Sequence, residues 1–186
     1  MNFRNETRRD RYNKKKNSSS KLPIEVCTVN FKEEVNVAFV LRSAACFGAS
    51  AVNVIGSVPK RKTLATRSGT LQDYVPINQF SNPHEFLQYC KQNAIKIVSA
   101  ELDSEAVSIH QHDFTDDLGS YKKICIVAGH EQLGIPVEIL SNSTKIYIPM
   151  PGVGFCLNTS VAASIFLYEA VKQISSNVLN KKTDAA

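Results

Sequence analysis

Five short runs of apolar, mostly β-branched residues are spaced along the chain, and they constrain the fold more than any other feature. Nearly every position within each run is apolar, which indicates strands covered on both faces, as in a parallel sheet. The runs are Ile24–Val29, Ala51–Ile55, Ile95–Ser99, Ile124–Ala128 and Ile146–Ile148.

Longer segments with helical patterns separate these runs. Glu34–Phe47 is almost entirely apolar and is followed by Gly48, a residue type that favours helix ends. A second helix is predicted over 83–93, where Asn82 precedes a proline at the first helical position. The longest helix is predicted over Leu157–Ile174. Strands that alternate with helices indicate an α/β domain with a mostly parallel sheet flanked by helices.

The positive charge of the chain is concentrated at its N-terminus. Residues 1–21 contain eight of the 22 Lys and Arg but only two of the 17 Asp and Glu. A segment this polar is predicted to be a disordered basic tail, ahead of a folded domain at 22–176 and a frayed C-terminal tail at 177–186. Such a tail suits a polyanion such as a nucleic acid, and a solubilising or simply disordered terminus is the alternative. The candidates for nucleic-acid binding in the tail are Arg8, Arg9, Arg11, Lys14, Lys15 and Lys16.

A second group of basic residues follows the second predicted strand. Lys60, Arg61, Lys62 and Arg67 are predicted to lie in a loop that contains no acidic residue. The loop is expected near the edge of the sheet at which α/β proteins bind ligands. A loop that contacts a ligand and an ordinary solvated loop fit this pattern equally well.

Composition excludes several classes of protein. No stretch approaches the roughly 20 apolar residues of a membrane span, and the polar N-terminus lacks the apolar core of a secretory signal. The five cysteines are widely spaced, which favours reduced, buried thiols in a cytoplasmic protein over disulfides or a zinc site. His110 and His112 form the only metal-like spacing, in an acidic loop, and no metal is expected.

Three segments carry residues that an ordinary sheet does not require. The first is an apolar helix that two polar residues, Asn36 and Arg42, interrupt. The second is a glycine-rich turn with one carboxylate at 129–134, and the third, at 148–162, joins a strand end, a Pro/Gly loop and the start of the last helix. The motif residues are Asn36, Arg42, Phe47 and Gly48, then Gly129, Glu131 and Gly134, and finally Ile148, Pro149, Met150, Leu157, Asn158, Ser160, Val161 and Ala162.

Taken in order, these segments resemble the three motifs of the TrmH-like (SpoU) class of SPOUT RNA methyltransferases, over about residues 24–174. The resemblance implies S-adenosylmethionine as methyl donor and a ribose 2′-hydroxyl of tRNA or rRNA as acceptor. It also implies a homodimer in which each active site is completed by the partner chain, with the first and last helices at the interface, and a deep C-terminal trefoil knot. The chain departs from the family at Cys156, where a serine is usual, and a thiol is the weaker hydrogen-bond donor.

The resemblance also implies roles for individual residues. Backbone and apolar groups of the second and third motifs would hold the adenosine. The cofactor-binding residues are then Gly129, Ile148, Met150, Cys156 and Leu157, and the catalytic residues are Arg42, Asn36, Glu131 and Asn158.

The physical chemistry of these side chains narrows their roles. A guanidinium stays protonated in proteins, so Arg42 is expected to clamp a phosphate, position the hydroxyl and stabilise its developing charge rather than remove its proton. Glu131 is expected to orient Arg42 or Asn36, or else to be a surface carboxylate. Asn36 and Asn158 could each serve as a helix cap as well as a site residue. A catalytically silent RNA-binding protein on the same fold is the alternative function.

Overall fold

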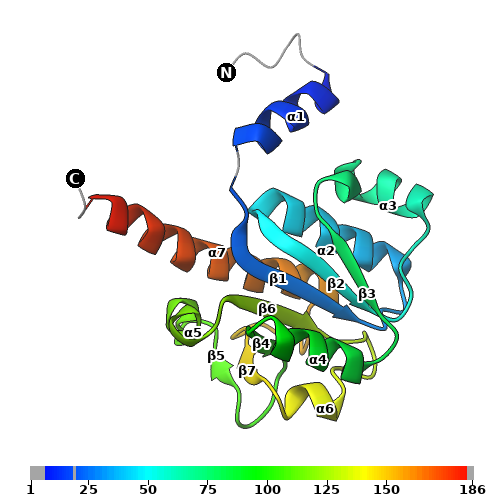
Figure 1. The fold of residues 1–186 in the computed structure, drawn as a ribbon. Coiled ribbons are helices and arrows are strands. Elements are labelled where there is room, and N and C mark those ends of the chain that lie inside the picture. The colour runs from blue at the N-terminus through cyan, green and yellow to red at the C-terminus, as the bar shows by residue number, and fades with distance from the viewer. Residues whose placement is uncertain (1–6, 19, 184–186) are drawn as a thin grey trace.

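The computed structural model describes residues 7–18 and 20–183 of the chain, and these form a seven-stranded sheet with helices on both faces (Figure 1). Every strand pair is parallel, and the strand order is β3-β2-β1-β6-β4-β7-β5. The strands are β1 Leu22–Val29, β2 Ala49–Ile55, β3 Ile77–Phe80, β4 Ile95–Ala100, β5 Val107–Ser108, β6 Lys123–Ala128 and β7 Thr144–Tyr147. The helices are α1 Arg8–Ser18, α2 Glu34–Phe47, α3 Arg61–Ser68, the 3-10 turn η1 Leu71–Asp73, α4 Pro83–Gln92, α5 Phe114–Ser120, α6 Val137–Leu140 and α7 Thr159–Thr183.

Two apolar cores confirm that the sheet is covered on both faces. Successive residues of a strand point to opposite faces, so Val26 of β1 packs in the core under α2 and α7, whereas Cys27 packs in the core under α4 and α6. Phe166 of α7 and Phe86 of α4 are buried in these two cores. All five predicted strands are present, because continuous apolar runs are a strong signal for central strands.

The two strands that the sequence pattern does not predict lie at the edges of the sheet. β3 pairs only with β2 and is partly exposed, and β5 consists of two residues paired with β7. A short edge strand does not need an apolar residue at every position, which is why both escape a search for apolar runs.

The prediction of a disordered tail over 1–21 is wrong for residues 8–18, which form α1. The hydroxyl of Thr7 accepts a hydrogen bond from the Asp10 N–H at 3.2 Å, at the start of the helix. Tyr12 packs edge-to-face on Tyr74, with ring centroids 5.6 Å apart, and Asn13 accepts a hydrogen bond from the Tyr74 hydroxyl at 3.0 Å. The helix therefore forms against the body of the protein. Residues 1–6 and 19 lie outside the described residues.

Two further segments are helical where the sequence indicates loop or frayed chain. The second basic cluster lies at and within α3, not in a loop, because Leu64 is buried and Gly69, at φ 70°, ends the helix in the left-handed conformation. Helix α7 continues to Thr183, well into the segment expected to fray, and residues 184–186 lie outside the described part of the chain.

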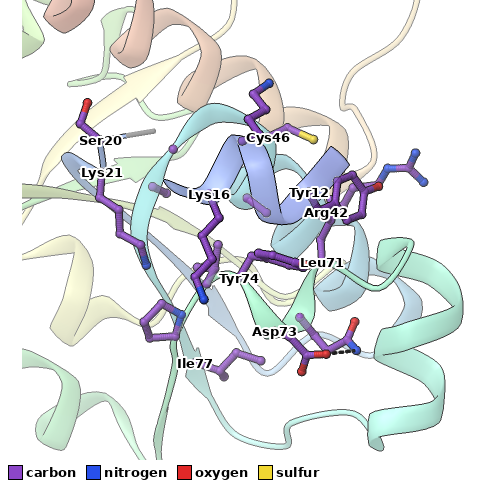
Figure 2. A pocket seen from close by; sticks show the side chains of 17 residues that line it. Tyr12, Lys16, Ser20, Lys21, Arg42, Cys46, Leu71, Asp73, Tyr74 and Ile77 are labelled. Carbon is purple, nitrogen blue, oxygen red and sulfur yellow. Dashed lines mark hydrogen bonds between the residues drawn. The ribbon is translucent and has the colours of Figure 1, made fainter. Parts of the chain in front are cut away.

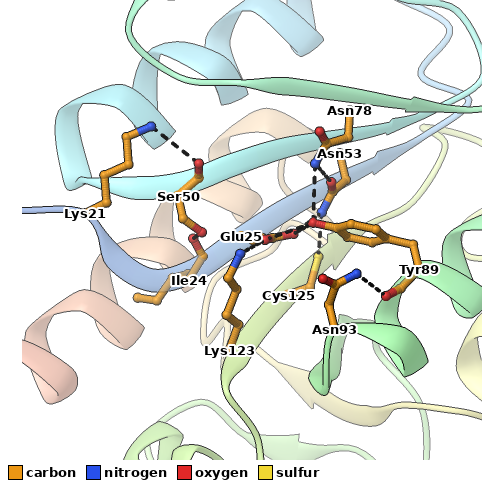
Figure 3. Close-up of polar contacts among 10 residues, drawn as sticks. All are labelled: Lys21, Ile24, Glu25, Ser50, Asn53, Asn78, Tyr89, Asn93, Lys123 and Cys125. Atoms are coloured by element: carbon orange, nitrogen blue, oxygen red, sulfur yellow. Dashed lines mark hydrogen bonds and ion pairs between the residues drawn. The ribbon is translucent and has the colours of Figure 1, made fainter.

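A polar cluster is buried between the sheet and α4 (Figure 3). The Glu25 carboxylate on β1 is fully buried and accepts hydrogen bonds from Asn53 at 2.7 Å, Lys123 at 2.7 Å and Tyr89 at 3.1 Å. Burial, and then the negative charge of Glu25, raise the pKa of the Tyr89 phenol, which therefore stays protonated and donates. We call these four residues the Glu25 cluster.

All five cysteines are free, and the expectation that they are buried holds for three of them. Cys27, Cys90 and Cys125 are buried, and burial raises the pKa of each thiol, in Cys90 to about 12. Cys46 and Cys156 are exposed. The prediction of a buried thiol is therefore wrong at these two positions, which lie on a helix surface and in the Pro/Gly loop.

Candidate functional site

Three polar residues from distant parts of the sequence meet beyond the carboxyl ends of β1 and β6. Asn36 lies in the first turn of α2 and is only 3% exposed. Its amide nitrogen donates to the Glu131 carboxylate at 2.7 Å, and its amide oxygen accepts from the Asn158 amide at 3.2 Å. We call these residues the Asn36 triad. Of the two residues that Glu131 is predicted to orient, Asn36 is the one that it contacts.

Glu131 also fixes the chain that enters α2. Its carboxylate accepts hydrogen bonds from the backbone N–H groups of Lys32 at 2.8 Å and Glu33 at 3.3 Å. Partial burial raises the pKa of Glu131, but the hydrogen bonds from Lys32 and Asn36 outweigh it, so the net pKa lies below the ordinary 4.5. The carboxylate is therefore ionised at neutral pH, and although the residue is exposed, it makes three hydrogen bonds to the first turn of α2 and the chain before it.

The capping predictions have different outcomes for the two asparagines. Asn158 caps α7, because its side-chain oxygen accepts from the Ser160 N–H at 2.9 Å while its amide faces Asn36. Asn36 is not the cap of α2, a position that Glu33 occupies without a side-chain hydrogen bond. The side-chain amide of Asn36 forms hydrogen bonds with Glu131 and Asn158 instead.

The turn that carries Glu131 is held closed by a direct approach of backbone to backbone. His130 and Gly134 exchange two hydrogen bonds of 3.0 Å. A Cβ on Gly129 would lie 2.4 Å from the carbonyl carbon of Gly134, too close for any side chain. Gly129 is thus required by the packing of this turn.

A pocket of about 410 Å³ lies between this turn and the Pro/Gly loop. All five residues predicted to bind the cofactor line it, and so do Glu131 and Asn158. Its walls combine apolar side chains, among them Phe166, with backbone from two loops. We call it the loop pocket. The predicted residues that line it are Gly129, Ile148, Met150, Cys156 and Leu157.

The sequence analysis missed Glu101, which also lines the loop pocket. It directly follows β4, and its carboxylate accepts the Leu102 N–H at 3.1 Å. A polar residue just past the carboxyl end of a parallel strand is the signal that could have identified it.

Arg42 lies apart from the Asn36 triad within one chain. It is exposed and lines a separate cleft beneath α1 (Figure 2). A Cβ on Gly69 would be 3.8 Å from its Nη1 atom, which places the guanidinium beside the end of α3. The structure therefore brings together three of the four predicted catalytic residues, and not the fourth.

An apolar groove of about 420 Å³ runs between α2 and α7, the helices predicted to form a dimer interface. Phe39 is 41% exposed, Ile165 37% and Tyr168 55%. The Tyr168 ring lies 5.8 Å from that of Phe47. These large apolar side chains face outward although both helices also bury an apolar face against the sheet.

The predicted RNA-binding residues occupy two surfaces. Lys15 and Lys16 line the cleft beneath α1, and Arg61 pairs with Asp73 at 2.9 Å. The side chain of Arg8 lies outside what the structure describes. The remaining predicted residues on α1 are Arg9, Arg11 and Lys14, and those at α3 are Lys60, Lys62 and Arg67.

Within residues 7–18 and 20–183, no group of three or more His, Cys, Asp or Glu side chains could hold a metal ion. His112 instead pairs with Asp117 at 2.9 Å. No helix in the same part of the chain is long and apolar enough to cross a bilayer.

The fold is that of RNA-modifying enzymes. A solved structure described as the A. aeolicus TrmH/SpoU tRNA modifying enzyme superposes with a TM-score of 0.77, is 27% identical, and is matched over 91% of this chain and 85% of its own. A structure described as an RNA 2′-O ribose methyltransferase superposes with a TM-score of 0.71, is 28% identical, and is matched over 83% of this chain and 58% of its own.

Sequence comparison defines the family. Residues 23–168 match the SpoU rRNA Methylase family, and the chain belongs to it. A tRNA (guanosine(18)-2′-O)-methyltransferase of Escherichia coli K12 is 27% identical over 151 residues, which cover 81% of this chain and 63% of that protein. The enzyme of the same description from Aquifex aeolicus is 31% identical over 148 residues, or 77% and 66% of the two chains. The chain thus spans a little under two thirds of the Escherichia coli relative.

Proposed function

We propose that the protein transfers a methyl group from S-adenosylmethionine to a ribose 2′-hydroxyl of RNA, either tRNA or rRNA. The observation that carries this proposal is the loop pocket, which joins the predicted cofactor residues to the Asn36 triad in a member of the SpoU family. The names of the relatives support both classes of RNA, since one group acts on tRNA and another, 30% identical over 145 residues, is a 23S rRNA methyltransferase.

The loop pocket suits an adenosine-containing cofactor. Its volume lies within the roughly 300–1,000 Å³ of small-molecule sites, and such sites combine apolar walls with a few polar groups. Ile148, Met150 and Leu157 would enclose the adenine, and the Glu101 carboxylate would accept hydrogen bonds from ribose hydroxyls. When bound, the cofactor supplies an electrophilic sulfonium methyl group. Cysteine in place of the usual serine at position 156 does not prevent backbone groups of the same loop from contacting the cofactor.

Arg42 enters this site from a second copy of the chain. The guanidinium would clamp the phosphate beside the reacting ribose and stabilise the negative charge that develops on its 2′-oxygen. The hydroxyl proton would pass to a phosphate oxygen or to water. The exposed apolar groove of α2 and α7 supports the required homodimer, because Arg42 lies on α2 itself.

Substituting Ile165 with glutamate is expected to convert the dimer to monomers, because it places a charge in the proposed apolar interface. Light scattering coupled to size exclusion measures the mass, and methyl transfer should be lost in parallel. Val107→Glu is the matched control, since Val107 is 40% exposed on the edge strand β5. A mass equal to that of wild type for Ile165→Glu would rule out this interface.

Glu131→Gln is expected to lower kcat by on the order of 10-fold, because charge-assisted hydrogen bonds are about twice as strong as neutral ones. The lowered pKa of Glu131 makes the bonds fully present above the ordinary pKa of 4.5, and they are lost as the pH falls through the lowered value. The acid limb of the rate profile in wild type should therefore be absent in the variant. Glu138→Gln, an exposed carboxylate on α6, serves as the control. If kcat and the acid limb of Glu131→Gln equal those of wild type, Glu131 has no role in the reaction.

Two further proposals concern the chain topology and the location of the protein. We propose that the chain beyond β6 forms a deep trefoil knot, in support of which the turn at 129–134 and the loop at 148–158 share one pocket. We also propose a cytoplasmic location, in which five free thiols stay reduced.

Three measurements test the proposed activity. Total RNA from a strain that lacks the gene should accept labelled methyl groups from S-adenosylmethionine, and mapping of the 2′-O-methyl sites lost in that strain should identify the nucleotide. Calorimetry with S-adenosylmethionine separates the enzyme from a silent RNA-binding protein, which has no need of the cofactor. Absence of both binding and transfer would refute the proposed function.

A further inference from the structure

The largest cleft described above lies beneath α1, next to Arg42 and away from the loop pocket. It has a volume of about 750 Å³ and is walled by α1, the chain just before β1, α2, η1 and the segment that joins η1 to β3 (Figure 2). Two aromatic rings, of Tyr12 and Tyr74, stand in it at an interplanar angle of 76°. We call it the Tyr74 cleft. Nothing in the proposed cofactor site accounts for it.

Positive charge converges on the Tyr74 cleft from three elements. Lys15 and Lys16 come from α1, Lys21 from the chain before β1, and Arg42 from α2. Asp73 is the one acidic residue among the described residues that line the cleft, and it is paired with Arg61. The cleft is therefore suited to an anion.

The cations and aromatic rings of the cleft are interleaved. The Lys16 amino group lies 5.7 Å from the centroid of the Tyr74 ring, within cation–π distance. Lys21 points toward the same opening (Figure 2), and its amino group donates to the Ser50 carbonyl oxygen at 3.5 Å (Figure 3). Burial, followed by the positive charges of Lys16 and Lys123, lowers the pKa of Lys21. An anion between the amino groups of Lys16 and Lys21 would relieve the repulsion between these two lysines.

Aromatic rings with adjacent lysines are the combination by which proteins hold unpaired nucleotides. Bases stack on tyrosine faces, and lysines neutralise the phosphates. Sequence-specific recognition of RNA mostly targets single-stranded loops, in which bases are unstacked and can lie against aromatic side chains. Because Arg42 shares the cleft and is proposed to hold the phosphate of the reacting nucleotide, the adjoining nucleotide would reach the cleft first.

We propose that the Tyr74 cleft binds the unpaired nucleotide that flanks the methylated one, with its base against Tyr74 and its phosphate between Lys16 and Lys21. The flexible Lys16 stem allows its amino group to move from the ring face to the phosphate. This inference rests on the proposed function and deepens it, since it makes the substrate an RNA with at least two adjacent unpaired nucleotides.

Fluorescence and binding measurements test the subsite directly. The chain contains no tryptophan, so Tyr74→Trp places a single indole in the cleft, and its emission should be quenched by a single-stranded decauridylate. Tyr74→Ala should weaken the Kd of fluorescein-labelled decauridylate at least about 5-fold, the lower range for loss of one stacked base, whereas Tyr74→Phe should stay within about 2-fold of wild type.

A charge-matched pair of variants separates the subsite from general attraction. Lys16→Gln should weaken binding more than Lys14→Gln, although both lie on α1, because only Lys16 lines the cleft. It should also lower the slope of log K against log salt by about 1.

Three results would overturn the subsite: unquenched emission in Tyr74→Trp, equal losses in Tyr74→Ala and Tyr74→Phe, or equal losses in the two lysine variants. Equal losses in the tyrosine variants would assign the effect to the hydrogen bond with Asn13. Calorimetry with S-adenosylmethionine and methyl transfer to total RNA by the wild type report on the proposed function independently, so the two failures are distinguishable.

Discussion

Replacing Arg42 with alanine is expected to lower kcat by about 100- to 1,000-fold while the affinity for S-adenosylmethionine stays unchanged. This is the loss typical of removing one group that stabilises developing negative charge. The affinity should be retained because Arg42 is proposed to contact the RNA phosphate and not the cofactor, and it does not line the loop pocket of its own chain. Single-turnover methyl transfer measures the rate, and calorimetry measures the affinity. Lys91→Ala, at the exposed end of α4, controls for loss of positive charge.

Two further variants separate the possible roles of Arg42. Arg42→Lys keeps the charge but loses the two-pronged guanidinium, so it should remain impaired; near-normal activity would contradict a phosphate clamp. Mixing Arg42→Ala with a Glu131→Ala chain tests whether the site spans two chains. If it does, each mixed dimer contains one intact site, and about one quarter of the activity should return. No recovery would place Arg42 and Glu131 in the same chain's site.

Replacing Lys123 with methionine is expected to lower the free energy of unfolding by about 3 kcal/mol, because it leaves the Glu25 carboxylate buried without its cation. Glu25 is fully buried, and Asn53 and Tyr89 would be its remaining donors. Urea denaturation followed by circular dichroism measures the change. The double variant Glu25→Gln/Lys123→Met should be more stable than Lys123→Met alone, since no charge is then left unpaired.

The solvent-exposed pair of Lys172 and Glu169 provides the matched comparison. Lys172 Nζ lies 3.1 Å from Glu169 Oε1, and the side chains of Lys172 and Glu169 are 58% and 21% exposed. Lys172→Met should therefore cost at most about 1 kcal/mol. Equal effects of the two lysine substitutions would show that burial of Glu25 adds nothing to its interaction with Lys123.

The central part of the fold is readable from the sequence because each central strand must be apolar on both faces. The edge strand β3 and helix α1 cannot be read from the sequence in this way, because neither has to be apolar on both faces. The polar residues of α1 give it little stability of its own, and the contacts of Tyr12 and Asn13 with Tyr74 come from a residue about 60 positions away. A local sequence pattern does not predict a contact with a residue so distant in the sequence.

Some residues of the candidate site can likewise be predicted from the sequence, and others cannot. The resemblance of the three motifs to the family predicts that Asn36, Glu131 and Asn158 belong together, and the structure joins them by hydrogen bonds. Arg42 lies six residues after Asn36, about one and two-thirds helical turns, so the two do not share a face of α2. Glu101 belongs to no motif and is found only when β4 and the loop pocket are seen together.

The Glu25 cluster and the Asn36 triad lie toward opposite ends of the same strands. Glu25 and Lys123 are near the amino ends of β1 and β6, whereas Glu131 follows the carboxyl end of β6. Because the two groups lie apart, we expect substitutions in the Glu25 cluster to change mainly the free energy of unfolding, and substitutions in the Asn36 triad to change mainly the chemistry of the site.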